Sequence, residues 1–235
     1  MSASIVSYAV NDGVAVITMD DGKANAVSLA MQDGLNAALD RAEADGLPVV
    51  LTGRTGFFSA GFDLKTLQAS GQPAVDMLRG GAELTIRMLT FPLPIVIASP
   101  GHAIAMGAFL SLCGDYRIGV SGNFRYVTNE VAIGMAMPFN VIEILRQRVT
   151  PAVFNRAALL SEIFTPDNAV AAGFLEEVVE PDALMPRALE YAATLKALDR
   201  TAHAVSKKRL RAPVVAAMRE GLAKDVEGWN KQFLA

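Results

Sequence analysis

Residues 94–115 read PIVIASPGHAIAMGAFLSLCGD, and this almost uncharged stretch decides the fold. The β-branched run Ile95–Ala98 is typical of a buried strand, which Pro100-Gly101 interrupts. The apolar run that follows is too short to cross a bilayer, and Met106–Cys113 favours a buried helix. The first N–H groups of such a helix lack intrahelical acceptors and attract an anionic oxygen. An ordinary core helix of an α/β protein explains the same residues.

Strand and helix patterns alternate on both sides of this stretch. Apolar runs at 5–10 and 14–19 flank Asn11-Asp12-Gly13 and predict a hairpin, and 49–52 predicts a buried strand followed by a loop over 53–62. The order predicts an α/β fold in two parts, a core over 1–180 and a C-terminal helical region over 181–235. The other predicted elements are helices over 29–44 (with Ser28 as N-cap), 65–70, 74–90, 138–149, 181–198 and 202–224, helices beginning at Pro151 and Pro166, strands over 116–120 and 123–127, and an extended segment over 174–179.

Composition excludes several classes of protein. A net charge of -3 gives no signal for nucleic acid or for an anionic membrane, and 52% hydrophobic residues can build a large core. The single cysteine, Cys113, excludes an internal disulfide and fits a reducing compartment, and two distant histidines give no metal-ligand cluster. The N-terminus lacks a secretion-signal pattern and no window is typical of a membrane span, so we expect a cytoplasmic protein.

A second informative stretch, residues 52–64, reads TGRTGFFSAGFDL. A strand ends, a Gly-rich loop follows, and a helix is predicted to begin near Asp63. The small residues Ser59-Ala60-Gly61 let a ligand approach the backbone closely. Two strand–loop–helix junctions at the ends of neighbouring parallel strands form a crevice, where two convergent N–H groups make an oxyanion hole.

These motifs together resemble the crotonase superfamily, the enoyl-CoA hydratases and isomerases. The segment FSAGFDL at 58–64 precedes GHAIAMGA at 101–108, and KANA at 23–26, EVAIG at 130–134 and AVAAGFL at 169–175 extend the resemblance over most of the chain. It implies a spiral of ββα units with a C-terminal helical region, assembled as homotrimers or dimers of trimers. It also implies an acyl-CoA thioester as substrate and no separate cofactor.

The resemblance implies roles for individual residues. The N–H groups of Phe62 and Met106 are expected to hold the thioester oxygen, and each donor is worth about 3 kcal/mol to an enolate oxyanion. Basic residues of the last helix, Lys207, Lys208, Arg209 and Arg211, either meet the CoA phosphates or form a solvated face. Substrate-binding positions are expected at Ala24, Ala26, Ala60, Asp63, Leu64, Gly107 and Phe109.

The sequence departs from the hydratase pattern on the central helix. A glycine triplet is replaced by Ala105-Met106-Gly107, and the position of the first catalytic glutamate is Phe109. The second glutamate falls on Glu130, and Met137–Asn140 replaces a Pro-Gly segment that helps position water. A single carboxylate suits a proton transfer from C2 to C4, which moves a double bond from Δ3 to Δ2. Apolar neighbours such as Val131, Ile133 and Phe109 are expected to raise the pKa of Glu130.

Other interpretations stay open at this point. The chain could be a hydratase in which another group replaces the lost carboxylate, an acyl-CoA binder without catalysis, or an α/β enzyme for a different anionic substrate. Glu130 could be a solvated carboxylate at a strand end. His102 either points into the site or is a hydrogen-bonded structural residue, and Asp115 is expected to fix the end of the central helix or its loop. Tyr126 and Asn129 are weaker candidates for a polar contact near Glu130.

Overall fold

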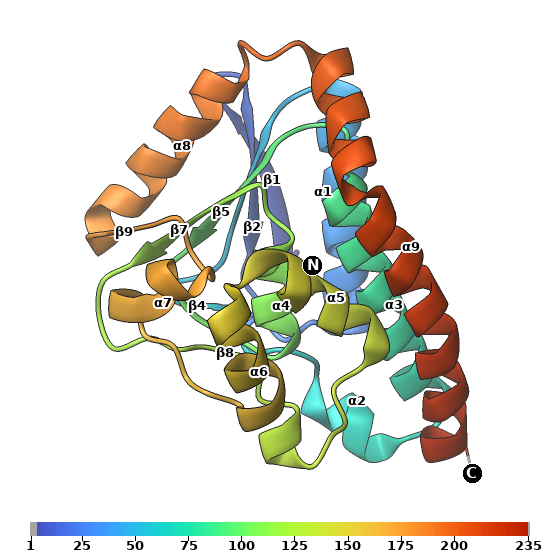
Figure 1. Ribbon diagram of the computed structural model, residues 1–235. Helices are drawn as coiled ribbons and strands as arrows, with labels where there is room; N and C mark the ends of the chain where they lie inside the picture. The colour runs from blue at the N-terminus through green and yellow to red at the C-terminus, as the bar shows by residue number, and fades with distance from the viewer. Residues whose placement is uncertain (1–3, 235) are drawn as a thin grey trace.

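The computed structural model describes residues 4–234 as two β-sheets covered by helices (Figure 1). The strands are β1 (Val6–Asn11), β2 (Val14–Met19), β3 (Val49–Thr52), β4 (Gly56–Ser59), β5 (Ile95–Ser99), β6 (Gly101–Ile104), β7 (Tyr116–Val120), β8 (Tyr126–Val127) and β9 (Glu177–Val179). The helices are α1 (Leu29–Asp45), α2 (Leu64–Ala69), α3 (Gln72–Thr90), α4 (Met106–Leu112), α5 (Phe139–Arg148), α6 (Pro151–Leu160), α7 (Pro166–Ala172), α8 (Leu184–Leu195) and α9 (Arg200–Phe233), with short 3-10 helices η1 (Val131–Ile133) and η2 (Pro181–Ala183).

The larger sheet lies between two apolar layers. Its strand order is β1-β2-β3-β5-β7-β9, with β1 antiparallel to β2 and the other neighbours parallel. Successive side chains of a strand point to opposite faces. Accordingly Val49 and Leu51 join the main core, whereas Val50 joins a smaller cluster with Leu184 and Ala188 of α8. Both faces of the central strands are therefore covered, as their continuous apolar runs require.

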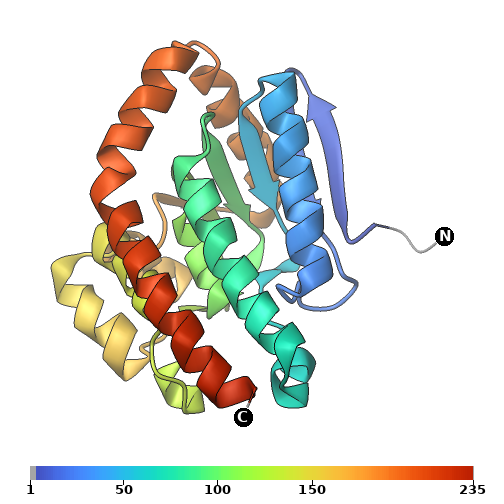
Figure 2. The same ribbon diagram turned by 90° about the vertical axis from the view of Figure 1, so that its right-hand side faces the viewer.

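Three long helices cover one face of this sheet. Figure 2 shows α1, α3 and α9 side by side, and α8 packs on the opposite face against β3, β5 and β7. The helix α9 runs the length of the molecule (Figure 1), and its last residue, Phe233, accepts hydrogen bonds from Ser70 and Gly71 just after α2. Within residues 4–234, no helix has the length and apolar character that crossing a membrane requires.

The smaller sheet, β4-β6-β8, is built from direct continuations of the larger one. The strands β3, β5 and β7 each lead into a strand of the smaller sheet, and a helix follows, which gives repeated ββα units. The three short strands are parallel, with Gly56 paired to Gly101 and Ala103 paired to Tyr126. Their carboxyl ends therefore lie at one edge, where a ligand site is expected.

The structure corrects several element boundaries. The region 53–62, predicted as a loop, contains β4, and the Pro-Gly interruption after β5 leads directly into β6. Both strands begin with glycine, which has low β-propensity, and the ladder between them stabilises them. The predicted helix 181–198 is η2 followed by α8, and the last helix continues past 224 to Phe233. The hairpin, the helix capped by Ser28 and the strands at 49–52 and 95–98 are confirmed.

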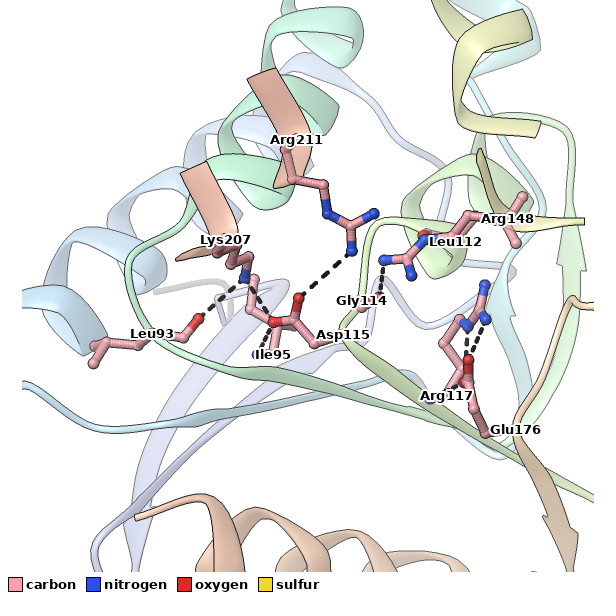
Figure 3. A network of polar contacts seen from close by, with 10 residues as sticks. All are labelled: Leu93, Ile95, Leu112, Gly114, Asp115, Arg117, Arg148, Glu176, Lys207 and Arg211. Carbon is pink, nitrogen blue, oxygen red and sulfur yellow. Dashed lines mark hydrogen bonds and ion pairs between the residues drawn. The ribbon is translucent and has the colours of Figure 1, made fainter. Parts of the chain in front are cut away.

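A buried ion-pair network fixes α9 to the sheet (Figure 3). Lys207 Nζ donates to Asp115 Oδ2 at 2.6 Å and to the Leu93 carbonyl oxygen at 3.3 Å, and Asp115 also accepts from the Ile95 N–H at 2.9 Å. Arg211 lies 3.8 Å from the same carboxylate. Lys207 and Arg211 are thus buried, and the expectation that they face CoA phosphates or solvent is wrong. Burial lowers the pKa of Lys207, against the opposing effect of Asp115.

Candidate active site

Three neighbouring strand ends deliver the predicted groups to one cavity. Phe62 follows β4, Met106 follows β6 and Glu130 follows β8, and these strands are adjacent and parallel. All three residues line a cavity of about 420 Å³, a size suited to a small ligand. The lining is mostly apolar and comprises Ala60, Phe62, Leu64, Leu67, Gln68, Leu78, Ala82, Ile104, Ala105, Met106, Asn129, Glu130, Ile133, Met135, Pro138, Asn140, Val141, Trp229, Gln232 and Phe233.

The backbone places the N–H groups of Phe62 and Met106 on adjoining loops. Gly61 has φ +94° and packs so closely that a Cβ there would lie 3.3 Å from the Met106 nitrogen. Met106 opens α4, so its N–H has no intrahelical acceptor. Among residues 4–234, neither the Phe62 nor the Met106 N–H has a hydrogen-bond acceptor. Two free donors at one cavity wall are the components of an oxyanion hole.

Close packing and local strain hold the Met106 loop. Ala105 has φ 49° and ψ -124°, a backbone conformation that residues other than glycine adopt only at an energetic cost. A Cβ on Gly107 would lie 2.3 Å from the Ser59 carbonyl oxygen, so only glycine lets α4 approach β4 this closely. The side chains of Phe62 and Met106 both pack against α3 at Gly81. The donors therefore sit on a rigid wall.

Glu130 is a buried carboxyl group. Its residue is 7% exposed, and its Oε2 atom has no hydrogen-bond partner among the described residues. Burial raises the pKa of the Glu130 carboxyl to about 7, while its own backbone N–H acts in the opposite direction. The alternative of a solvated carboxylate is therefore wrong, and the expected rise in pKa is confirmed. A carboxyl with this pKa can accept and return a proton near neutral pH.

Of the other residues predicted to bind substrate, some line the cavity and some lie beside it. Ala60 and Leu64 line the cavity, whereas Ala24 and Ala26 lie in a neighbouring loop that is held by a hydrogen bond from the Ala60 N–H to the Ala24 carbonyl oxygen. Asp63 is the N-cap of α2, and its carboxylate accepts from the Thr66 N–H.

Gly107, Phe109 and His102 lie outside the lining of this cavity. Phe109 is 1% exposed and belongs to the apolar core. His102 Nδ1 accepts from the Arg125 N–H at 3.1 Å, and its ring packs between Phe57 and Phe124. Of the two interpretations of His102, the hydrogen-bonded structural residue is therefore the correct one. Asp115, in turn, binds the first residue of β5 and Lys207 of α9.

Sequence reasoning pointed to the segment 137–140, which contains Asn140, but missed the part of the cavity that α9 supplies. Asn140, Trp229 and Phe233 line the cavity, although they are far from Phe62 in sequence. The Phe233 carbonyl oxygen accepts from the Gly71 N–H at 2.8 Å and from Ser70 Oγ at 3.0 Å, which fixes the end of α9 over the cavity. The one feature of the sequence that could have pointed to α9 is Trp229, the single tryptophan of the chain.

The chemistry of the arrangement follows from these groups. Two unpaired N–H donors stabilise negative charge on an oxygen, and the adjacent buried carboxyl can transfer a proton. Within residues 4–234, no cluster of three His, Cys, Asp or Glu side chains could hold a metal ion. The fold is therefore α/β, and the site combines two donors that can stabilise an oxyanion with a carboxyl group that can move a proton.

Comparisons with known proteins give the family. The model of the enoyl-CoA hydratase/isomerase family matches residues 9–233, and the chain belongs to this family. It is an acyl-CoA enzyme with the crotonase fold, in which two sheets and a long C-terminal helix recur among relatives.

Relatives of this chain are described with both activities of the family. An apo structure of a Mycobacterium tuberculosis enoyl-CoA isomerase is 45% identical with a TM-score of 0.91, and the match covers 98% of this chain and 100% of that one. A second structure of the same Mycobacterium tuberculosis protein, which describes it as a probable enoyl-CoA hydratase, is 45% identical with a TM-score of 0.93 and 98% of each chain covered. Human mitochondrial enoyl-CoA delta isomerase 1 is 31% identical over 85% of this chain and 68% of its own length.

Proposed function

We propose that this protein is an enoyl-CoA isomerase that converts 3-enoyl-CoA thioesters to 2-enoyl-CoA thioesters with a single base. The observation that carries the proposal is the composition of the cavity wall. Among the described residues that line the cavity, Glu130 is the one with an ionisable side chain. Moving a double bond by one position requires one group that removes a proton and returns it elsewhere, so one carboxylate is sufficient.

The proposed reaction proceeds through a dienolate. The N–H groups of Phe62 and Met106 donate to the thioester oxygen, and the Glu130 carboxylate removes a proton from C2. The C–H bonding electrons delocalise over the thioester and the 3,4 double bond, and the negative charge on oxygen is stabilised by the two donors, by about 3 kcal/mol each. Glu130 then returns its proton to C4, and the double bond lies between C2 and C3.

The CoA part of the substrate is proposed to lie over the loops around β4. Ala24, Ala26, Ala60, Asp63 and Leu64 are the expected contacts for adenine and pantetheine, and Ala60 and Leu64 support this by lining the cavity. Gly107 and Phe109 are proposed to shape the site by supporting the Met106 loop. We propose that region 181–235 forms the helical cover of a core over 1–180.

A hydratase is the second candidate. Two carboxamides line the cavity, those of Asn129 and Asn140, and the Oδ1 atom of each is buried without a partner among the described residues. Such groups can bind a water molecule, and one Mycobacterium tuberculosis relative is described both as an isomerase and as a probable hydratase. The hydratase would need one of these groups to replace the carboxylate absent at Phe109.

Separate incubations with 3-hexenoyl-CoA and 2-hexenoyl-CoA distinguish the candidates. An isomerase converts 3-hexenoyl-CoA to 2-hexenoyl-CoA and does not hydrate 2-hexenoyl-CoA. Formation of 3-hydroxyhexanoyl-CoA from 2-hexenoyl-CoA at a comparable rate would establish the hydratase instead. Binding of both thioesters with turnover of neither would identify an acyl-CoA binder, and absence of binding would favour a different anionic substrate.

We further propose that the protein forms homotrimers or dimers of trimers in the cytoplasm. Support for assembly comes from exposed apolar side chains on η1 and at the end of α6, which a hydrogen bond from the Ala132 N–H to Ser161 Oγ brings together. These exposed side chains are Val131, Ile133, Leu159, Leu160 and Ile163. Size-exclusion chromatography with light scattering tests the assembly, and a monomeric mass at micromolar concentration would contradict it.

A further inference from the structure

The Asn140 carboxamide is a buried polar group that the proposed reaction does not use. Asn140 is the second residue of α5 and is 1% exposed, and neither Oδ1 nor Nδ2 has a hydrogen-bond partner among residues 4–234. Its backbone is fixed, because the N–H groups of Phe139 and Asn140 donate to the two carboxylate oxygens of Asp225 at 2.9 and 3.0 Å. The Asn140 side chain therefore projects from a helix N-terminus that Asp225 holds in place.

The position of this carboxamide points to a ligand. Burying an amide without partners costs about 1–3 kcal/mol, so an unused position in a folded core favours an apolar residue. Asn140 lines the same cavity as Glu130 and Asn129, and these residues also carry unpartnered oxygen atoms. Unpartnered polar atoms thus gather where a substrate is proposed to bind.

The chemistry of the missing partner follows from the carboxamide and the cavity. The Oδ1 atom of Asn140 accepts hydrogen bonds and its Nδ2 atom donates them, so the best partner is a group that can both donate and accept. A hydroxyl oxygen does both. An anionic partner is disfavoured, because the carboxylate form of Glu130, the one ionisable group in the lining of the described cavity, would repel it. A cationic partner such as an ammonium group donates hydrogen bonds but cannot accept one from Nδ2.

We propose that Asn140 is a ligand-binding residue whose carboxamide hydrogen-bonds an uncharged hydroxyl-type oxygen inside the acyl-binding cavity. This oxygen belongs either to a hydroxyl group on the acyl chain or to a water molecule bound with the thioester. The inference rests on the proposed function, since it assumes that an acyl-CoA thioester occupies the cavity. It makes Asn140 a residue that determines which acyl groups bind tightly.

The test measures binding without turnover. Trp229 is the single tryptophan and lines the cavity, so its fluorescence reports occupancy. The ligands are hexanoyl-CoA and its 3-, 4- and 5-hydroxy derivatives. The test variant is Asn140→Leu, which keeps the size of the side chain and removes both hydrogen-bonding atoms, with Asn140→Ala as a second variant in case the first does not fold.

Gln147 provides a matched control on the same helix. Its Oε1 is also buried without a partner among the described residues, but Gln147 does not line the cavity. Gln147→Met should bind all four ligands within about twofold of the unchanged protein. Asn140→Leu should unfold at the same or a higher urea concentration, because it removes an unpaired amide, whereas a purely structural role predicts a loss of stability.

Two results support the proposal and identify the source of the oxygen. If one hydroxy derivative binds about tenfold more tightly than hexanoyl-CoA and Asn140→Leu abolishes the difference, the oxygen belongs to the acyl chain. If Asn140→Leu weakens all four ligands by about tenfold, the oxygen belongs to a bound water.

Two other results overturn it. If both Asn140 variants bind all four ligands as tightly as the unchanged protein, Asn140 has no ligand and the inference is wrong although the proposed function survives. If the unchanged protein binds none of the four, the proposed function fails and the inference fails with it.

Discussion

At the scale of single residues, the site depends on one carboxyl group whose surroundings change its acidity. Glu130 is buried at the end of β8, and burial raises its pKa to about 7. An ordinary glutamate would be ionised throughout the physiological range, but this one titrates within it. Burial gives the carboxyl a high proton affinity, and the residue lines the cavity.

This pKa predicts the pH dependence of the proposed isomerisation. The carboxylate is the form that accepts the C2 proton, so kcat/KM should rise with pH, reach half its maximum near pH 7 and then stay level. Below the midpoint the rate should fall by about tenfold per pH unit. Initial rates with 3-hexenoyl-CoA between pH 5 and 9 check this. A midpoint near 4.5, the ordinary value for glutamate, would show that Glu130 is not the base.

Ala105 predicts an effect on stability. Its positive φ carries a cost for any residue with a Cβ, of about 1 kcal/mol or more, and glycine removes that cost. Ala105→Gly should therefore raise the free energy of unfolding by about 1 kcal/mol in urea denaturation. Ala37→Gly, in the exposed middle of α1, is the matched control and should lower it by about the same amount. Loss of stability in both variants would contradict the assignment of strain.

At the scale of elements, α9 is joined to the sheet by buried charge. Lys207 of α9 donates to Asp115, which follows α4 and also accepts from the first residue of β5 (Figure 3). Removal of one partner leaves the other charge buried with fewer hydrogen bonds, which is much more costly than losing a surface pair. Three elements that are distant in sequence are therefore coupled at one carboxylate.

Replacement of Lys207 tests this coupling. Lys207→Met should lower the free energy of unfolding by about 3 kcal/mol, because it leaves the Asp115 carboxylate without its closest cation. Lys231→Met removes the exposed pair with Glu227 on the same helix and should change stability by less than about 0.5 kcal/mol. Equal effects of the two substitutions in urea denaturation would argue against a special role for the buried pair.

The elements were predictable from sequence to different degrees. The strands at 49–52 and 95–98 were found because β-branched residues follow one another between turn signals. The strands β4 and β6 were missed because they are short, begin with glycine and form only through pairing with each other. The last turns of α9 were missed because exposed polar residues there hide the buried Trp229.

At the scale of the whole molecule, the cavity is assembled from segments that are far apart in the sequence, from Ala60 to Phe233. The wall with Phe62, Met106 and Glu130 was predictable, since a resemblance over short motifs points to those positions. The wall with Trp229 and Phe233 was not, because it depends on how α9 packs against α3 and α5, whereas the sequence had pointed to the segment that contains Asn140. No local pattern records such long-range packing.

Shortening α9 tests the contribution of this second wall. A variant that ends at Gly228 lacks Trp229, Gln232 and Phe233, whereas the core residues Val214, Met218 and Leu222 remain. Its circular dichroism should stay close to that of the full chain, and its affinity for hexanoyl-CoA should fall by about tenfold or more, because large apolar contacts are lost. Isothermal titration calorimetry measures this. Unchanged affinity would show that α9 does not cover the bound acyl group.

The most direct measurement for the account as a whole follows the C2 proton itself. With 3-hexenoyl-CoA carrying deuterium at C2, the unchanged protein should remove that deuterium and pass it to C4 or to solvent, as NMR can show. Glu130→Gln should bind hexanoyl-CoA with unchanged Trp229 fluorescence response and remove the deuterium about a thousandfold more slowly. If Glu130→Gln removed it at the rate of the unchanged protein, another group would be the base and the proposed mechanism would be wrong.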